Sequence, residues 1–318
     1  MMMDAAFSAD QLALAANVRD VLRAHCPPAA LRSERRPGWK QLAGLGFFQV
    51  LSPEEDGGLG LRLIDVVPAL EETGRACLPG PVVETAVVGA YLLGGAEPVT
   101  VAVLPPGQAY AADADLADLV VVVRDGAARS FPAASVRLSP RPGPDPCRPL
   151  FEVTTETPGE PLGADVGAAL RAGAVATAAQ LVGVARHLLS TTVAYAGART
   201  QFGAPIGSFQ AVKHQLADAA VAVEFAAPLV WRAAVTADKA LAGADRDASA
   251  AKAAAGEAAT LAARTALQVH GAIGYTDELD LRFWLARAWS LSSAYGTTAH
   301  HRERLRAAIV DGSPRRYP

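Results

Sequence analysis

One segment of the sequence combines residue types that suit an anionic ligand. Residues 199–210 read Arg-Thr-Gln-Phe-Gly-Ala-Pro-Ile-Gly-Ser-Phe-Gln and fall in a break between two long apolar stretches. A guanidinium can bind a phosphate through two parallel hydrogen bonds, and glycine lets a backbone approach its ligand closely. Arg199 therefore suits an anion, and Phe202 suits a flat or apolar part of the same ligand. A helix cap followed by a core phenylalanine explains these residues equally well.

A second segment, Gln268–Tyr275, closes another long helical stretch. Its glycines fit a helix C-cap, where a left-handed backbone is required. A histidine inside an apolar helix is more often a satisfied core residue than a metal ligand, which is our interpretation of His270. His300 and His301 lack the spacing and the glutamate of a zinc-binding H-E-x-x-H motif. We therefore predict no metal site.

Composition excludes several functional classes. The 318 residues carry 29 Lys and Arg against 32 Asp and Glu, a formal net charge of −3, so the basic footprint of a nucleic-acid-binding protein is absent. The three cysteines are isolated, which argues against a zinc or disulfide framework. Met1–Asp10 lacks the pattern of a signal peptide, and the apolar runs Ala86–Leu93 and Leu119–Val123 are too short to span a bilayer. We expect a cytoplasmic protein with no membrane span.

The chain divides into three regions of different texture. Residues 8–95 are helical in pattern, with a capping box at Ser8–Gln11, and residues 99–160 contain short β-branched runs that predict strands. Residues 165–312 predict long helices joined by short loops, as in an antiparallel bundle. The expected helices are Val166–Ala198, Phe209–Ala242, Ala248–Val269, Asp280–Tyr295 and Thr298–Asp311. These helices are apolar on most faces, which predicts a subunit interface in addition to the bundle core.

Taken together, the motifs resemble those of the acyl-CoA dehydrogenase superfamily. The resemblance rests on Arg199-x-x-Phe202-Gly203, Phe209-Gln210-x-x-Lys213-His214-x-x-Ala217-Asp218, and Gln268-x-His270-Gly271-x-x-Gly274-Tyr275. The N-terminal hundred residues add Pro53-Glu54-Glu55-x-Gly57-Gly58-Leu59-Gly60 and Glu71-Glu72-x-Gly74-Arg75. The resemblance implies a mostly α fold with a small β region. Its parts would be an N-terminal helical domain (1–98), a reduced middle β domain (99–162) and a C-terminal four-helix bundle (163–318).

The resemblance also implies a cofactor and a reaction. Members of the superfamily bind FAD and oxidise acyl-CoA thioesters: a glutamate removes the α-proton while the β-hydrogen leaves as hydride to the flavin. In family homodimers the Arg-x-x-Phe loop and the Gln-x-x-Gly segment reach the neighbouring subunit's FAD, on its pyrophosphate and adenosine side. The implied FAD-binding residues are Arg199, Gln201, Phe202, Gln210, Gln268, Val269, Gly271 and Ala272.

The chain departs from the family pattern at the catalytic base. The common Tyr-Glu-Gly-Thr run reads Ala294-Tyr-Gly-Thr297, so Tyr295 occupies the position of the base. A phenol with a pKa near ~10 is a poor base for this step. The alternative base position of the family falls near Gly173, and no carboxylate lies between Asp165 and Arg199. The Thr-Glu-Pro-x-x-Gly-Ser-Asp stretch that lines the flavin ring is also missing from residues 99–160.

These departures favour a division of labour between two chains. This chain would lend the ADP side of an FAD site in trans, and a longer homologue would supply the flavin pocket, the catalytic Glu and most of the acyl-CoA site. Heteromeric α2β2 acyl-CoA dehydrogenases of actinobacterial steroid side-chain degradation are built in this way, and residues 202–214 and 301–305 resemble theirs. The chain alone would then be inactive.

Two alternatives remain open at this point. The chain could be a self-sufficient homomeric dehydrogenase with an atypical base, such as Asp277, Glu278 or Asp280, although these carboxylates also suit the start of the next helix. It could instead be a non-redox scaffold that has lost FAD. For Tyr295 the alternative role is that of an aromatic residue filling space at an interface.

Overall fold

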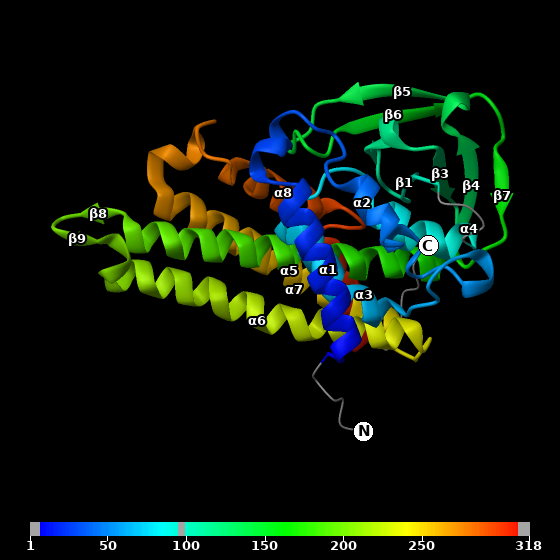
Figure 1. Ribbon diagram of the computed structural model, residues 1–318. Coiled ribbons are helices and arrows are strands. Elements are labelled where there is room, and N and C mark those ends of the chain that lie inside the picture. The colour runs from blue at the N-terminus through cyan, green and yellow to red at the C-terminus, as the bar shows by residue number, and fades with distance from the viewer. Residues whose placement is uncertain (1–6, 95–98, 311–318) are drawn as a thin grey trace.

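The computed structural model describes residues 7–94 and 99–310. A long helical bundle carries a small β region at one end and a two-stranded hairpin at the other (Figure 1). Met1–Ala6 lie outside the described residues, and with them most of the segment on which the absence of a signal peptide was predicted. The predicted class, mostly helical with a small β region, is confirmed.

The N-terminal region packs short helices around one longer helix. Its elements are α1 (Ala9–His25), η1 (Pro28–Arg32), α2 (Trp39–Gly44), η2 (Phe47–Gln49), η3 (Glu54–Asp56), α3 (Leu63–Arg75), η4 (Glu84–Val88) and α4 (Gly89–Leu93). The predicted capping box is present: Ser8 Oγ accepts from the Gln11 amide at 3.2 Å, and Gln11 Oε1 accepts from the Ser8 amide at 2.8 Å. The η4 segment is a π-helical turn, a form that often marks functional sites.

The β region forms two small sheets. Its elements are β1 (Val101–Leu104), β2 (Ala111–Ala112), η5 (Ala114–Leu116), β3 (Leu119–Arg124), β4 (Ala127–Pro132), η6 (Ala133–Ser135), β5 (Val136–Arg141), β6 (Leu150–Thr155) and β7 (Glu160–Leu162). The sheets have the strand orders β1-β3-β4-β7 and β2-β6-β5, and β1 pairs with β3 in parallel. Strand β4 was not predicted because its exposed positions interrupt the β-branched pattern.

The C-terminal region is the bundle that the sequence predicts. Its elements are α5 (Val166–Ala198), β8 (Thr200–Gln201), β9 (Ala204–Pro205), η7 (Ile206–Ser208), α6 (Gln210–Asp238), α7 (Ala244–His270), η8 (Gly271–Tyr275), α8 (Leu281–Ser293) and α9 (Thr298–Val310). The bounds of α5 are those predicted. The bounds of α6, α7 and α8 shift by one to four residues, the usual scatter at helix ends.

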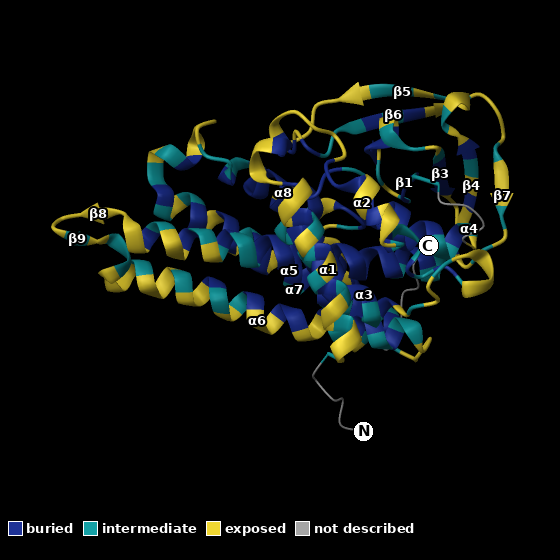
Figure 2. Ribbon diagram, in the orientation of Figure 1, coloured by how far each residue is buried: buried dark blue, intermediate teal, exposed yellow. Residues whose placement is uncertain are grey.

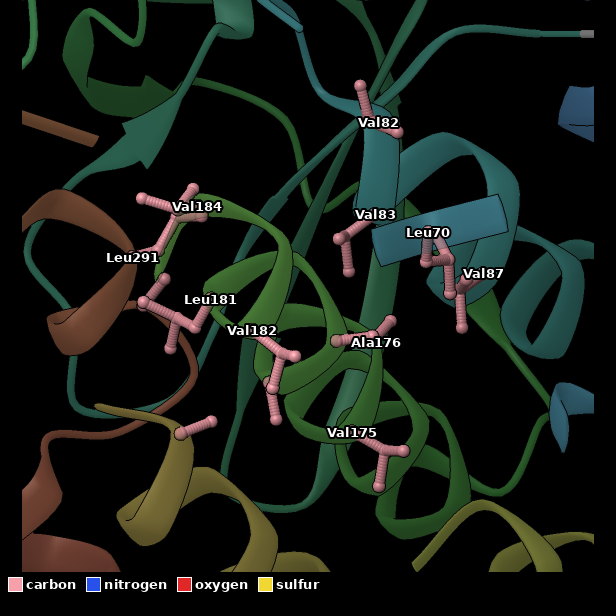
Figure 3. Packing of buried hydrophobic residues seen from close by; sticks show 14 of the residues in the cluster. Leu70, Val82, Val83, Val87, Val175, Ala176, Leu181, Val182, Val184 and Leu291 are labelled. Atoms are coloured by element: carbon pink, nitrogen blue, oxygen red, sulfur yellow. The ribbon is translucent and has the colours of Figure 1, made fainter. Parts of the chain in front are cut away.

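The apolar character of the helices has two different explanations. Helix α5 is buried by the chain itself, because α3, α6, α7 and α8 pack around it and its valines and leucines fill the core (Figure 3). The prediction that these helices need a subunit interface is therefore wrong for most of α5. Helix α6 differs, since Val221, Phe225 and Leu229 stay 55%, 75% and 37% exposed on one face (Figure 2).

Helices α5 and α6 are each long and apolar enough to cross a membrane, judged by length and composition alone. The apolar stretch of α5 is 89% buried inside the protein, whereas that of α6 is 44% buried. A buried core helix meets the same criteria as a membrane span, so α5 is explained by the packing of the bundle.

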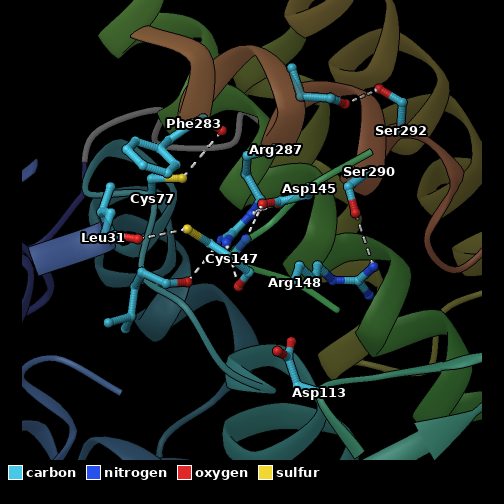
Figure 4. A network of polar contacts seen from close by, with 12 residues as sticks. Leu31, Cys77, Asp113, Asp145, Cys147, Arg148, Phe283, Arg287, Ser290 and Ser292 are labelled. Atoms are coloured by element: carbon cyan, nitrogen blue, oxygen red, sulfur yellow. Dashed lines mark hydrogen bonds and ion pairs between the residues drawn. The ribbon is translucent and has the colours of Figure 1, made fainter. Parts of the chain in front are cut away.

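A buried polar network connects the three regions (Figure 4). Arg287 on α8 donates through Nε to Asp145 at 2.5 Å, through one terminal nitrogen to the carbonyl of Leu78 at 2.8 Å, and through the other to the carbonyl of Cys147 at 3.2 Å. Both charged side chains are nearly inaccessible. One guanidinium thus fixes the loop before β6 to the N-terminal helices and to the bundle.

Candidate functional site

The hairpin between α5 and α6 presents a strained, exposed aromatic residue. Its two strands pair Thr200 with Pro205 and Gln201 with Ala204, which leaves Phe202 and Gly203 at the turn. Both turn residues have positive φ, +53° at Phe202 and +80° at Gly203. A bulky residue in this conformation is strained, and the Phe202 side chain is 94% exposed. Because the ring is exposed, packing in the core of this chain does not explain the strained backbone. The exposed ring therefore suggests a role in binding.

Stacked rings bring the second predicted segment to the same end of the bundle. The Tyr195 ring, one turn before Arg199 on α5, stacks on the His270 ring with centroids 4.2 Å apart. His270 Nδ1 also lies 2.8 Å from the carbonyl oxygen of Ala266, so His270 is a satisfied residue of the bundle. Helix α7 ends at His270, and its C-cap residue Gly271 has φ +65°.

Most of the predicted FAD-binding side chains point outward at this end. Arg199, Gln201, Phe202, Gln210, Gln268 and Ala272 are exposed, and Val269 and Gly271 are half-buried. Within residues 7–94 and 99–310, Arg199 makes no ion pair, and a β-carbon placed on Gly271 would meet open space. We refer to these eight residues as the arm. The structure brings them together, with the hairpin projecting beyond the bundle core (Figure 2).

The arm fits one side of a dinucleotide. An unpaired guanidinium suits a pyrophosphate, the exposed glutamines offer amide donors and acceptors, and Phe202 offers an apolar face. All these groups lie on an outward surface, so the arm could contact a ligand from one side only. FAD held by the arm would need its other walls from a second chain.

Tyr295, which the sequence analysis matched to the catalytic base of the family, packs against Gly173, the alternative base position. A β-carbon on Gly173 would lie 2.7 Å from Tyr295 Cε1 and 2.9 Å from Val88 Cγ2. The two residues matched to base positions therefore touch, and their neighbours leave no space for a side chain at Gly173. Tyr295 is 6% exposed, and its burial raises the pKa of the phenol well above its usual value. It fills space inside this chain, so the expectation of an aromatic residue at an interface is not met.

A carboxylate that the sequence analysis missed lies beside this tyrosine. Tyr295 Oη donates to Glu84 Oε1 at 3.3 Å, and a terminal nitrogen of Arg148 lies 3.7 Å from the same oxygen. Glu84 is 6% exposed and belongs to the π-helical turn. In the sequence, the one feature that could have identified Glu84 is its position as the single acidic residue of a largely apolar run, Pro81–Leu93.

Two buried bases hold the backbone of the Tyr295 loop. Lys252 Nζ donates to the carbonyls of Ser292 at 3.2 Å and Gly296 at 3.1 Å, and His301 Nε2 lies 2.9 Å from the carbonyl oxygen of Tyr295. Burial lowers the pKa of Lys252 to about 7 and that of His301 to about 3. Because Tyr295 has φ +52° and Gly296 φ +104°, these contacts maintain an otherwise unfavourable turn.

A cavity of about 330 Å³ borders the other side of the same loop. Its walls are Pro105–Gln108, Leu170, Ser293, Tyr295–Thr297 and His300. The cavity offers amide and imidazole groups, and its walls contain no carboxylate side chain.

The three carboxylates named as alternative bases are surface groups. Asp277 and Glu278 are exposed, and Asp277 pairs with Arg282 at 2.5 Å. Asp280 precedes α8 without capping it, since it accepts instead from Arg32 at 2.6 Å. Among the described residues none of the three forms a hydrogen bond or ion pair with the Tyr295 loop, and the ion pairs of Asp277 and Asp280 give these two a structural role.

Comparison with known proteins identifies relatives over nearly the whole chain. The acyl-CoA dehydrogenase C-terminal domain family matches residues 164–310, and the acyl-CoA dehydrogenase N-terminal domain family matches residues 8–106. Acyl-CoA dehydrogenase IpdE2 of Mycobacterium tuberculosis is 35% identical over 85% of this chain and 88% of its own length. The protein of the same name from Mycolicibacterium smegmatis is 32% identical over 92% of this chain and 96% of its own length.

Solved structures share the fold. A variant of the Tcur3481–Tcur3483 steroid ACAD (acyl-CoA dehydrogenase) superposes with a TM-score of 0.83 at 25% identity, covering 95% of this chain and 98% of that one. The ChsE4–ChsE5 complex from Mycobacterium tuberculosis gives a TM-score of 0.81 at 20% identity, over 98% of this chain and 100% of that one. The resemblance predicted from the motifs is confirmed.

Proposed function

This chain belongs to the acyl-CoA dehydrogenase family, and we propose that it is the non-catalytic subunit of a heteromeric, FAD-dependent member. In this proposal the arm holds the pyrophosphate and adenosine side of FAD in trans. A longer homologue supplies the flavin pocket, the catalytic Glu and most of the acyl-CoA site, in an α2β2 assembly in the cytoplasm. FAD would supply the hydride acceptor, and this chain would contribute binding and orientation.

The contact between Tyr295 and Gly173 carries this proposal. It joins the two positions that the sequence analysis matched to a base, and the packing around Gly173 leaves no room for a side chain there. The arm, in contrast, keeps its side chains and exposes them. A chain that retains one half of a shared site and fills the other half is explained by pairing with a complementary subunit.

The apolar face of α6 supports a partner. Val221, Phe225 and Leu229 recur at four-residue intervals, so they lie on one side of the helix that leads away from the hairpin. Large obligate interfaces are apolar in this way. The face and the arm together would bring the partner's flavin site against Arg199.

The proposed substrate is a steroid side-chain CoA ester. Support comes from the likeness to the Tcur3481–Tcur3483 protein, a steroid ACAD that is 25% identical to this chain. The partner would bind most of this ester, because Tyr295 and Val88 fill the space next to Gly173 and the cavity beside the Tyr295 loop has no carboxylate among its lining side chains.

The proposal is tested by expressing the chain alone, expressing it with a longer homologue that carries the glutamate, and assaying acyl-CoA oxidation with an artificial electron acceptor. We expect no turnover and weak FAD binding from the chain alone, and both activity and bound flavin from the co-expressed pair. Full turnover by the chain alone would refute the proposal.

One observation favours a second candidate, a self-sufficient dehydrogenase with an atypical base. Glu84 is the carboxylate that Tyr295 contacts, and it lies closer to the base position than Asp277, Glu278 or Asp280. In that case the chain alone would be active and Glu84→Gln would abolish turnover. In the heteromeric assembly the same substitution would leave the partner's catalysis intact.

A further inference from the structure

A second cavity, of about 410 Å³, lies in the N-terminal region and shares no lining residue with the cavity beside Tyr295. Four segments line it: residues 36–43 around α2, residues 48–52 after α2, residues 85–93 of η4 and α4, and residues 99–100 before β1. Its volume falls in the range of small-molecule sites. Neither the arm nor the Tyr295 loop accounts for it.

The interior of this cavity is preformed and mostly apolar, with Gln49, Ser52, Thr85 and Thr100 adding polar groups to its wall. Trp39 and Phe48 stack with ring centroids 4.3 Å apart and an interplanar angle of 21°. A hydrogen bond fixes the orientation of the indole, because Trp39 Nε1 donates to the carbonyl of Pro79 at 2.8 Å. Leu93 and Val99 complete the apolar lining. A ligand would therefore enter a rigid aromatic and aliphatic site without having to order it.

The edge of the cavity is cationic. Arg36 and Lys40 both line it, four residues apart, and both are exposed. Among the described residues neither makes an ion pair, although Arg32 and Arg35 nearby are paired with Asp280 and Asp115. Two unpaired cations beside an apolar interior complement a molecule with an anionic head and an apolar tail.

We infer that this cavity, formed by Arg36, Lys40, Trp39, Phe48 and Leu93, binds a medium-chain aliphatic carboxylate. The carboxylate would lie between Arg36 and Lys40, and the chain would lie against the Trp39–Phe48 pair. This inference is independent of the FAD arm, because none of these residues belongs to it.

The cavity shares a wall with the Tyr295 region. Thr85, Gly89 and Leu93 line the cavity, whereas Glu84 and Val88 of the same helical segment contact Tyr295 and approach Gly173. A ligand in the cavity would rest on the back of the π-helical turn that positions Glu84.

The test is calorimetric titration of the purified chain with decanoate. Decanol, which has the apolar tail without the charge, and acetate, which has the charge without a long tail, are titrated in parallel. We expect decanoate to bind more tightly than either. The double variant Arg36→Glu and Lys40→Glu should weaken decanoate by at least about tenfold while leaving decanol unchanged. Ala43→Trp, at an exposed lining position, should remove binding of both.

Arg124→Glu, at an exposed position on β3 outside the cavity, is the matched charge control and should bind decanoate as the wild type does. Circular dichroism and the thermal midpoint establish that each variant is folded. The inference is overturned if the wild type does not bind decanoate, if decanol binds equally well, or if the folded double variant retains wild-type affinity.

Discussion

The ring of Tyr295 lies directly against Gly173, close enough that a β-carbon on the glycine would be 2.7 Å from Cε1 of the ring. The contact joins the loop after α8 to the first half of α5. These are the two positions that the sequence analysis matched to the family's catalytic glutamate, and one packed contact joins them. A side chain added at Gly173 would require Tyr295 and Val88 to move.

We first predict that Gly173→Ala destabilises the protein by ~1–3 kcal/mol, because overpacking a rigid site forces its neighbours to shift. In a Tyr295→Ala background the same change should cost less, since the ring that it meets is gone. Urea unfolding of the four proteins measures the coupling. Gly197→Ala, on the same helix with open space at its β-carbon, should be neutral or stabilising. If Gly173→Ala lowered the unfolding free energy equally with and without the Tyr295 ring, the close contact between Gly173 and Tyr295 would be contradicted.

A second prediction concerns the buried Arg287. Replacing it by Met leaves the Asp145 carboxylate uncompensated inside the protein and should cost ~3–5 kcal/mol. Adding Asp145→Asn should recover part of this loss. The exposed pair Arg137–Glu156, with both side chains over 70% accessible, provides the control, and Arg137→Met should change stability by less than ~1 kcal/mol. A small effect of Arg287→Met would mean that the network does not hold the three regions together.

A third prediction is a pH dependence caused by Asp113. Burial raises the pKa of its carboxyl to about 7, and neither oxygen has a hydrogen-bond partner in the described part of the chain. The folded state therefore holds this proton more tightly than the unfolded state. Its stabilising effect is complete below the unfolded pKa of 3.8 and is lost as the pH rises to about 7.

The substitution Asp113→Asn mimics the neutral carboxyl and should remove this dependence. We expect the variant and the wild type to be equally stable near pH 4, and the variant to be more stable at pH 8, by an amount on the order of 3 kcal/mol. Asp125→Asn, at another residue with positive φ in the β region that is exposed, controls for the change in backbone preference. A constant difference between Asp113→Asn and the wild type across this pH range would contradict the assignment.

A fourth prediction addresses the exposed face of α6. Phe225→Asp should leave the unfolding free energy of the isolated chain nearly unchanged, because the side chain is 75% exposed. It should weaken assembly with the longer homologue by placing a charge in an apolar interface. Analytical ultracentrifugation of the co-expressed pair measures this effect. Leu12→Asp, at a 53% exposed position on α1, should leave assembly intact.

Sequence reasoning predicted what is encoded locally. Helix α5 was predicted to the residue because a nearly unbroken run of Ala, Val and Leu begins after Asp165, whose side chain caps the helix, and ends before Arg199. The residues of the arm were proposed from the resemblance of their short, contiguous motifs to those of the family, and their role in FAD binding stays a prediction. Their convergence on one end of the bundle depends on the stack of Tyr195 on His270, which no periodicity predicts.

The residues that were missed act across long separations. Glu84 and Tyr295 are 211 residues apart in sequence, and Lys252 reaches carbonyls 40 and 44 residues away. A single lysine in a helix is expected to be exposed to solvent, but Lys252 is fully buried. Only the packing of α7 against the loop after α8 reveals its role. The burial of α5 was likewise hidden, because apolar periodicity does not distinguish a core from an interface.

The flavin content of the co-expressed complex tests the central claim most directly. FAD is measured by absorbance and after its release by denaturation. The wild-type complex is compared with one that carries Arg199→Ala in this chain and a wild-type partner. Arg264→Ala, at an exposed arginine of α7 outside the arm, is the matched control. If the arm holds FAD in trans, Arg199→Ala lowers the FAD bound per complex while the control and the assembly stay unchanged. Full FAD content in an intact Arg199→Ala complex would contradict the account.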